Sequence, residues 1–337
     1  MGRSPLIEGG GSQGTLIFKC LERPMSHLSN RVELTVKLLL LAMVVLPLVA
    51  CKSDKPASNA FATEEDAGNA VLAAVKAGDR DKLLAIFGPN SENVIFSGDA
   101  VQDKNNANRF STGYGVMHRW RKMADGSEIL VVGADNFPFP IPLKKNDQGQ
   151  WFFDTAAGKE EILNRRVGRN ELATIEACRS AADAQQQYFA QVHDGGRKRQ
   201  YAQKFISDPG KQNGLYWNSA EGQPESPLGP LAAFATSEGY NVKPDAHTPF
   251  NGYYFHMLLG QGSNAPGGAK QYVKDGKMVG GFAFVAYPAQ YGNSGVMTFI
   301  INQDGVLLEK DLGQATAETA AAMSEFDPDG GWTPVSR

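Results

Sequence analysis

The sequence predicts an α+β protein with two domains, an N-terminal domain over residues 62–165 and a C-terminal domain over residues 166–337. Apolar residues recur at helical spacing in the first part of each domain, which favours amphipathic helices there. Runs of alternating apolar residues follow, and turn sequences such as Asp275-Gly276 separate them. Such runs are typical of antiparallel strands joined by hairpins.

The N-terminal domain is predicted to begin with two helices. Thr63 is suited to cap the first, with Asp66 three residues later in a variant of the capping box, and Gly78 ends it. Asp79 is placed to cap a second, shorter helix. The apolar positions of the first helix are Ala67, Ala70, Val71, Ala74 and Val75.

A weaker helix and a small antiparallel sheet are expected to complete this domain. The weaker helical pattern covers residues 110–120, after the polar stretch 103–106. Residues 128–132 and the hairpin 137–155, which turns at 146–149, read as strands. The first part of this hairpin contains Pro138, Pro140 and Pro142. Because proline has no N–H to donate to a strand ladder, this part is expected at a sheet edge or in an extended loop.

The C-terminal domain is predicted to place a long helix on an antiparallel sheet. Glycines at 158–168 suggest the boundary, and the helix is expected from about Arg169, with Cys178 as a core residue on its apolar face. A Pro- and Gly-rich stretch at 207–250 contains one short apolar helix. Strands are expected in GYYFHMLLG, GKMVGGFAFVAYP, SGVMTFIINQDG and GVLLEKDLG. Both faces of these strands are apolar, so we expect covers on both sides, one of them the long helix.

The segment 25–50 has the features of a lipoprotein signal peptide. Basic residues precede an apolar stretch of 13 residues from Leu38 to Ala50, too short to span about 30 Å of hydrocarbon. Leu48-Val49-Ala50-Cys51 ends it, so we expect cleavage between Ala50 and Cys51 and a lipid on the Cys51 thiol. A retained membrane anchor is the alternative. Residues 51–61 are interpreted as a tether, and residues 1–24 as a miscalled extension before Met25.

The composition bears on several classes of function. The formal net charge is −3 and no basic stripe is visible, which argues against a nucleic-acid partner. With Cys51 lipidated and Cys20 in the extension, Cys178 is left alone, which excludes multi-cysteine metal sites and an internal disulfide. No cofactor or metal is expected.

The sequence from Cys51 onward contains none of the usual catalytic motifs. An enzyme is therefore not favoured, although a hydrolase site that forms only on folding stays open, with His247 or His256 as its base. The aromatic residues of the last third are the other candidates. Tyr253, Tyr287 and Tyr291 are expected to contribute to a surface that binds a partner, unless they pack inside the sheet.

Several motifs resemble a known family. The runs FPFPIPL, WFFDT, RRVGRNEL, GLYW, SPLGPL, NGYYF and GGAKQYVKDGKMVGGFAFVAYPAQYGNSGVMTFIINQDGVLLEKDLG look like domain of unknown function family 2950 of bacterial envelope proteins. That family has no assigned activity, so the resemblance implies an envelope location and no catalytic residue. The long helix before the last sheet is also similar to the globular half of type IV pilins, although RNELATIEACRSAAD is too polar for a pilin membrane helix.

These observations lead to an expected function. We expect a non-catalytic lipoprotein of the bacterial envelope, anchored by the lipid on Cys51, that faces the periplasm and presents a surface to an envelope protein or glycan. A pilin-like assembly subunit is a further alternative. Lys52 rather than aspartate follows Cys51, and lipoprotein sorting rules then favour the outer membrane over the inner membrane.

We predict that the mature chain begins at a lipidated Cys51. Mass spectrometry of the N-terminal peptide from isolated membranes should find a diacylglycerol-bearing Cys51, and Cys51→Ser should release the protein from the membrane fraction, because one acyl group or none holds a protein only weakly. A peptide that extends upstream of Cys51, or an unmodified Cys51 thiol, would contradict the prediction.

Overall fold

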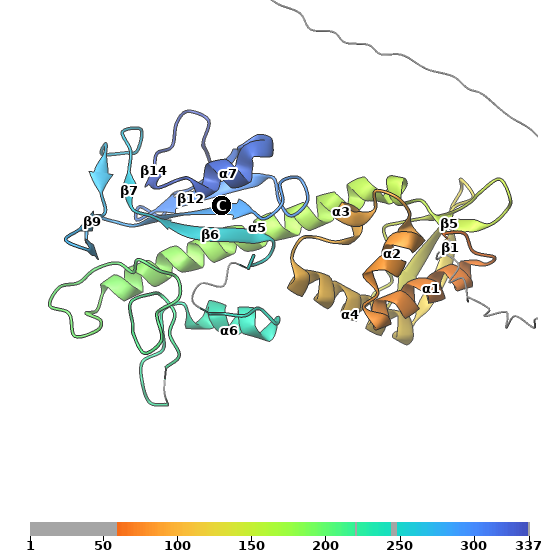
Figure 1. Ribbon diagram of the computed structural model, residues 1–337, viewed down its shortest axis with the longest axis horizontal. Coiled ribbons are helices and arrows are strands. Elements are labelled where there is room, and N and C mark those ends of the chain that lie inside the picture. Colours follow the sequence, from red (N-terminus) through yellow and green to blue (C-terminus); the bar gives the residue numbers. More distant parts are fainter. Residues whose placement is uncertain (1–58, 220, 244–247, 336–337) are drawn as a thin grey trace, which may run out of the picture. The chain divides into compact units, whose positions relative to one another are not determined.

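The computed structural model describes residues 59–219, 221–243 and 248–335 (Figure 1), and these belong to one compact unit. The segment 25–50 predicted as a signal peptide, Cys51 and His247 lie outside the described residues. Phe61, expected at the end of the tether, already belongs to the folded part, since it exchanges backbone hydrogen bonds of 2.7 and 2.8 Å with Trp151. Within the described residues, no helix has the length and apolar character needed to cross a membrane.

The N-terminal region packs four helices against a small sheet. The helices are α1 (Glu64–Ala77), α2 (Arg80–Phe87), α3 (Glu92–Ile95) and α4 (Ala100–Val116). The strands are β1 (His118–Lys122), β2 (Glu128–Val132), β3 (Phe137–Pro138), β4 (Leu143–Lys145) and β5 (Trp151–Phe153). The antiparallel sheet has the order β1-β2-β4-β5, and β3 pairs with β2.

The predicted helix caps of this region are confirmed. The Thr63 side chain accepts a hydrogen bond from the Asp66 amide at 3.0 Å, and Gly78 ends α1 in the left-handed conformation. Asp79 caps α2 by accepting from the Lys82 amide. Local polar side chains therefore set where these helices begin, as their spacing indicates.

The helix predicted over residues 110–120 exists, but its predicted first and last residues are wrong. Helix α4 begins at Ala100 rather than near Phe110, because Asp99 caps it by accepting from the amides of Val101 and Gln102. The polar stretch 103–106 lies within this helix. The predicted helix end at Trp120 is instead part of β1, which pairs along its whole length with β2.

Helix α5 (Thr155–Phe189) also begins earlier than predicted. Asp154 caps it by accepting from the Ala157 amide at 3.1 Å. Gly158, read as part of a domain boundary, lies inside the helix: a Cβ there would come within 2.7 Å of the Pro140 oxygen and 2.9 Å of Ile141. Because Gly158 has no side chain, α5 can pack closely against residues 140 and 141. Helix α5 continues through residue 165, the predicted boundary between the two domains. The division of the chain into two domains stays a prediction.

The C-terminal region contains the larger antiparallel sheet, in the order β15-β13-β12-β11-β6. Its strands are β6 (Tyr253–Leu258), β11 (Ala283–Pro288), β12 (Met297–Asn302), β13 (Leu307–Asp311) and β15 (Thr333–Pro334). Around it lie β7 (Gly260–Gln261), β8 (Lys270–Gln271), β9 (Val273–Lys274), β10 (Lys277–Met278), β14 (Glu325–Phe326), the 3-10 turn η1 (Gly313–Ala315) and the helices α6 (Gly229–Ser237) and α7 (Thr316–Ala321).

Both faces of this sheet are covered, as predicted. Helix α5 packs on β12 and β13, and α7 packs on β11 from the opposite side (Figure 1). All six residues of β11 are buried. Strand β6 lies at the edge of the sheet, and residues of α6 and Phe205 lie beside it. The fold is therefore α+β, with its main core between α5, the sheet and α7.

A buried cation lies in the middle of α5. Arg166 is 6% exposed, and its guanidinium donates to the backbone oxygens of Asn93 (2.9 Å) and Val94 (2.5 Å) and to the side chain of Asn293. Burial lowers the pKa of Arg166. The hydrogen bonds offset the loss of hydration of the guanidinium and join the chain around α3 to the loop that follows β11.

Two further buried hydrogen-bond groups join the same parts of the chain. Asn170, one turn beyond Arg166, accepts from the Gln102 side chain at 2.9 Å and donates to the Ser294 oxygen at 2.8 Å. The Asp99 carboxylate accepts from the Tyr240 hydroxyl at 2.8 Å and from the Gly252 amide at 3.0 Å. We call these groups, Arg166, Asn170 and Asp99 with their partners, the polar network.

We predict that Arg166→Met lowers the free energy of unfolding by about 3 kcal/mol, because it leaves buried carbonyl groups without a donor. The matched control is Arg165→Met. The Arg165 side chain is 40% exposed and pairs with Glu161 at 2.6 Å, so its loss should cost less than about 1 kcal/mol. Urea unfolding followed by circular dichroism measures both. Equal losses for the two variants would show that the polar network does not hold the fold.

We also predict a loss of stability in alkali. Burial raises the pKa of Tyr188 and of Tyr272 to about 12, so their hydroxyls keep protons that the unfolded chain loses near pH 10. The stability that these groups contribute below pH 10 is therefore lost as the pH rises from about 10 to about 12. Urea unfolding at pH 9, 10 and 11 should show this fall, and Tyr188→Phe should make it shallower. A fall with an unchanged slope in Tyr188→Phe would contradict the assignment.

Candidate functional site

A cavity of about 410 Å³ lies between α5, α6 and the edge strand β6 of the C-terminal region. We call it the apolar chamber. Its apolar and aromatic lining residues are Ala177, Ala181, Phe205, Ile206, Tyr216, Leu228, Leu231, Ala232, Ala235, Tyr240, Val242, Pro249, Phe250, Tyr254 and Phe255. Its remaining lining residues are Lys204, Asp208, Asn241, Lys243 and Thr248.

Small residues on two helices make room for this chamber. Ala177 and Ala181 lie one turn apart on α5, and Ala232 and Ala235 are the buried residues of α6. Leu231 is the larger α6 side chain in the lining. Pro230 stands in the first turn of α6, where its missing N–H would have no partner within the helix.

Aromatic rings form the other walls. Phe205 meets Phe255 edge to face, with ring centroids 6.2 Å apart. Tyr240 meets Phe250 in the same way at 5.0 Å. The Tyr240 hydroxyl is held by Asp99 and by the Asn251 amide, and burial raises its pKa, so it stays a neutral donor. The polar network therefore also fixes one wall of the apolar chamber.

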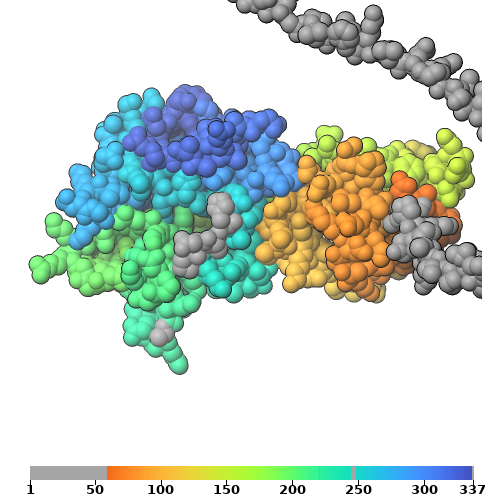
Figure 2. Space-filling model, viewed as in Figure 1, coloured from red at the N-terminus to blue at the C-terminus, as the bar shows by residue number. Residues whose placement is uncertain are grey.

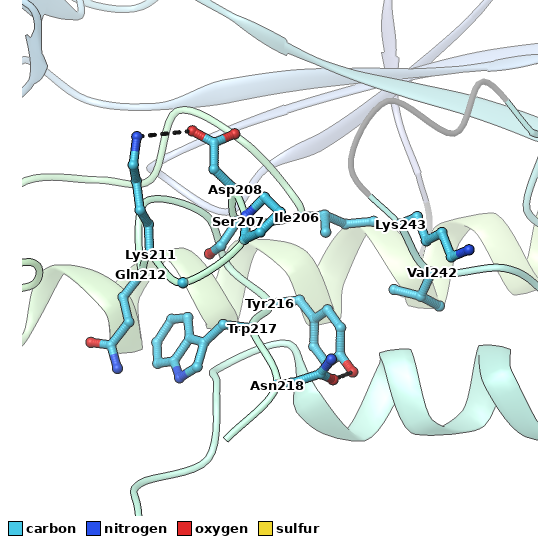
Figure 3. Close-up of a pocket in the computed structure, with 12 residues that line it drawn as sticks. Ile206, Ser207, Asp208, Lys211, Gln212, Tyr216, Trp217, Asn218, Val242 and Lys243 are labelled. Carbon is cyan, nitrogen blue, oxygen red and sulfur yellow. Dashed lines mark hydrogen bonds and ion pairs between the residues drawn. The ribbon is translucent and has the colours of Figure 1, made fainter. Parts of the chain in front are cut away.

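A second cavity of about 380 Å³ adjoins the first (Figure 3). We call it the polar chamber. It lies between the loop 206–212, residues 216–218 and residues 242–243, and Figure 3 shows Val242 and Lys243 across from Lys211 and Gln212. Ile206, Asp208, Tyr216, Val242 and Lys243 line both cavities. The two chambers therefore adjoin along a shared wall, built by segments that Figure 2 colours green and teal.

Side-chain bonds hold the loop of the polar chamber in place. Asp208 pairs with Lys204 at 2.5 Å and accepts from Asn213 at 2.8 Å, and the bond from Lys204, with that from Asn213, lowers the pKa of Asp208 to about 2. Behind the loop, Tyr188 donates to the Gln212 oxygen at 2.6 Å and stacks on His193. The loop is thereby tied to the end of α5.

The lining carries an excess of positive charge. Lys204, Lys211 and Lys243 line one or both chambers, against the single carboxylate of Asp208. Asp208 lies near two of these lysines, since Lys211 is 3.6 Å from it. No ion pair joins Lys243 to a carboxylate of the described residues. The site is thus cationic in a chain whose formal net charge is −3.

The three predicted tyrosines do not come together as a surface. Tyr253 is fully buried under α5, where its hydroxyl donates to the Met297 oxygen, and Tyr287 is 6% exposed. Tyr291 lies in the turn after β11, and its hydroxyl donates to Asp311. Burial therefore removes Tyr253 and Tyr287 from any binding surface, because neighbouring helices cover both faces of the sheet.

Two aromatic neighbours of Tyr253 do line the site. Tyr254 and Phe255 follow it on the edge strand and reach the apolar chamber. The aromatic run in the sequence is the signal for this part of the site. No comparable signal marks Phe205 or Leu231, whose segments read as loop and short helix. Their place in the wall depends on contacts far apart in the sequence.

The histidine and cysteine candidates lie elsewhere. The His256 Nε2 atom is 2.9 Å from the Met323 oxygen, on the sheet face that α7 covers, and His247 lies outside the described residues. Cys178 is fully buried, which raises the pKa of its thiol, so it is an unreactive core residue. In the described part of the chain, no group of three or more histidine, cysteine or acidic side chains is placed to hold a metal ion.

Comparisons with known proteins give one result. Searches of curated proteins and of solved structures found no match, so the likeness to pilins stays a prediction. The model of a family described as "Protein of unknown function (DUF2950)" matches residues 58–335, nearly all of the described chain. The chain therefore belongs to the DUF2950 family, as its motifs indicate.

Proposed function

We propose that this chain is a non-catalytic envelope lipoprotein that binds a ligand in the adjoining apolar and polar chambers. The apolar chamber carries the proposal. Its volume of about 410 Å³ and its largely apolar and aromatic lining, with a few polar groups, are typical of small-molecule sites. The site is built on α5, α6 and the sheet edge, which are rigid elements held by the main core.

The polar groups of the site favour binding over catalysis. Asp208 has its oxygens engaged by Lys204, Lys211 and Asn213, and the hydrogen bonds keep it ionised. The described lining of the two chambers includes neither a histidine nor a cysteine. Its side chains can orient a ligand by charge, hydrogen bonds and aromatic contact.

The proposed anchor at Cys51 complements such a site. A lipid on Cys51 would hold the chain at a membrane surface and raise the local concentration of amphipathic molecules around it. This arrangement supports a role in holding or presenting a membrane-derived or envelope molecule.

A photocrosslinking experiment on the full chain in its native envelope tests the proposal. Benzoylphenylalanine at Leu231 places the photoreactive group in the wall of the apolar chamber. The same group at Phe234, which is 53% exposed on α6 and outside the lining, is the matched control. We expect a discrete adduct at position 231 that is absent at position 234.

A blocking variant completes the test. Ala232→Trp should fill the apolar chamber and abolish the adduct at position 231, because the indole occupies the space of the ligand. Ala233→Trp adds the same side chain at an exposed position of α6 and should leave the adduct unchanged. Thermal unfolding of both variants shows whether they are folded. Equal adduct yields at 231 and 234, or an adduct that persists in folded Ala232→Trp, would overturn the proposal.

A further inference from the structure

We propose that the ligand is an anionic amphiphile with one long alkyl chain, whose chain lies in the apolar chamber and whose anionic group lies in the polar chamber beside Lys243. This inference rests on the proposed function and specifies the ligand class. Two features of the site carry it: the apolar and polar chambers share one wall, and that wall includes the cationic side chain of Lys243.

The apolar chamber suits an alkyl chain. Its walls are the rings of Phe205, Phe250 and Phe255 and the small side chains of α5 and α6. Each methylene group buried against such walls is favourable, because its apolar surface is removed from water. Two of the polar side chains in its lining, Asp208 and Lys243, also line the polar chamber. A long chain can therefore be buried there without leaving a polar group of its own unsatisfied.

The charge of the site sets the sign of the head group. Asp208 is already neutralised by Lys204 at 2.5 Å, and Lys211 lies 3.6 Å away. Lys243 lines both chambers, without a carboxylate partner in the described residues. An anion beside Lys243 would thus meet a net positive field of about two charges, whereas a cationic head would be repelled.

The polar chamber also has groups that can hold a head group by hydrogen bonds. The Ser207, Gln212 and Asn218 side chains line it, and Tyr216 donates to Asn218 at 2.7 Å. Trp217 adds an aromatic wall whose ring lies 5.6 Å from that of His193. A carboxylate or phosphate is of a size to fit among these groups, while its chain continues past Ile206 into the apolar chamber.

The test uses the full chain in isolated native membranes and three photoreactive probes. The probes share one diazirine-bearing, alkyne-tagged long alkyl chain and end in a carboxylate, an alcohol or a primary ammonium group. Mass spectrometry then locates the label on tryptic peptides. We expect the carboxylate probe to label the peptides of α6 and β6 about tenfold more than the alcohol probe does, and the ammonium probe to label them least.

Two charge-reversal variants test whether the charge of Lys243, rather than the apolar chamber alone, decides which probe binds. Lys243→Glu should lower carboxylate labelling about tenfold and leave alcohol labelling unchanged. Lys159→Glu is the matched control, because it reverses one exposed charge in the first turns of α5, where an acidic residue is favourable; it should change neither. Ala232→Trp should lower the labelling of the α6 and β6 peptides by the carboxylate probe, and undiminished label in this folded variant would show that the alkyl chain does not occupy the apolar chamber.

The outcomes distinguish the two proposals. Equal labelling by all three probes, or an unchanged preference in Lys243→Glu, would overturn the anionic ligand while the binding site stands. Absence of label in the chambers from every probe, with a discrete adduct at Leu231, would replace the amphiphile by a ligand of another class, such as a glycan or a peptide. If no probe labels the chambers and no adduct forms at Leu231, the proposal of a binding site is wrong.

Discussion

The structure depends on the burial of one guanidinium. Arg166 lies in the middle of the longest helix, and a cation with 6% exposure is stable only if its N–H groups meet acceptors. Those acceptors are backbone oxygens of residues 93–96 and the side chain of Asn293. The position of α3 and that of the loop after β11 are therefore both set by the same side chain of α5.

The polar network extends this constraint to the candidate site. Asp99 caps α4 with one carboxylate oxygen and receives Tyr240 and Gly252 with the other. Tyr240 lines the apolar chamber, and Gly252 precedes the edge strand β6, which supplies Phe255 to its wall. One carboxylate thus positions a helix start, a chamber wall and the entry to a strand. The chamber is open because these parts are fixed around it and cannot collapse onto it.

Sequence reasoning succeeds where the determining contacts are local. Thr63 and Asp79 cap their helices by bonds to amides three residues away, and the 302–305 turn closes within four residues. Sequence reasoning fails where a contact between residues far apart in the chain determines the local structure. Gly158 reads as a break because nothing nearby shows that residues 140–141 require its missing side chain. Tyr253 reads as a surface candidate because the pattern of one strand does not show which of its residues the long helix covers, although the helix itself is predicted. The chambers themselves lie in the Pro- and Gly-rich stretch, whose path no periodicity describes.

The spacing of the polar network along the chain has a consequence for the order of folding. Helix α5 needs only bonds between residues four apart, so it can form on the microsecond scale. The bonds of Asp99 with Tyr240 and Gly252 span 141 and 153 residues, and that of Asn293 with Phe96 spans 197. Closing such loops is slow and must follow synthesis of the last third of the chain. The polar groups around Asp99 therefore stay hydrated until the C-terminal sheet has formed and their hydrogen-bond partners are in place.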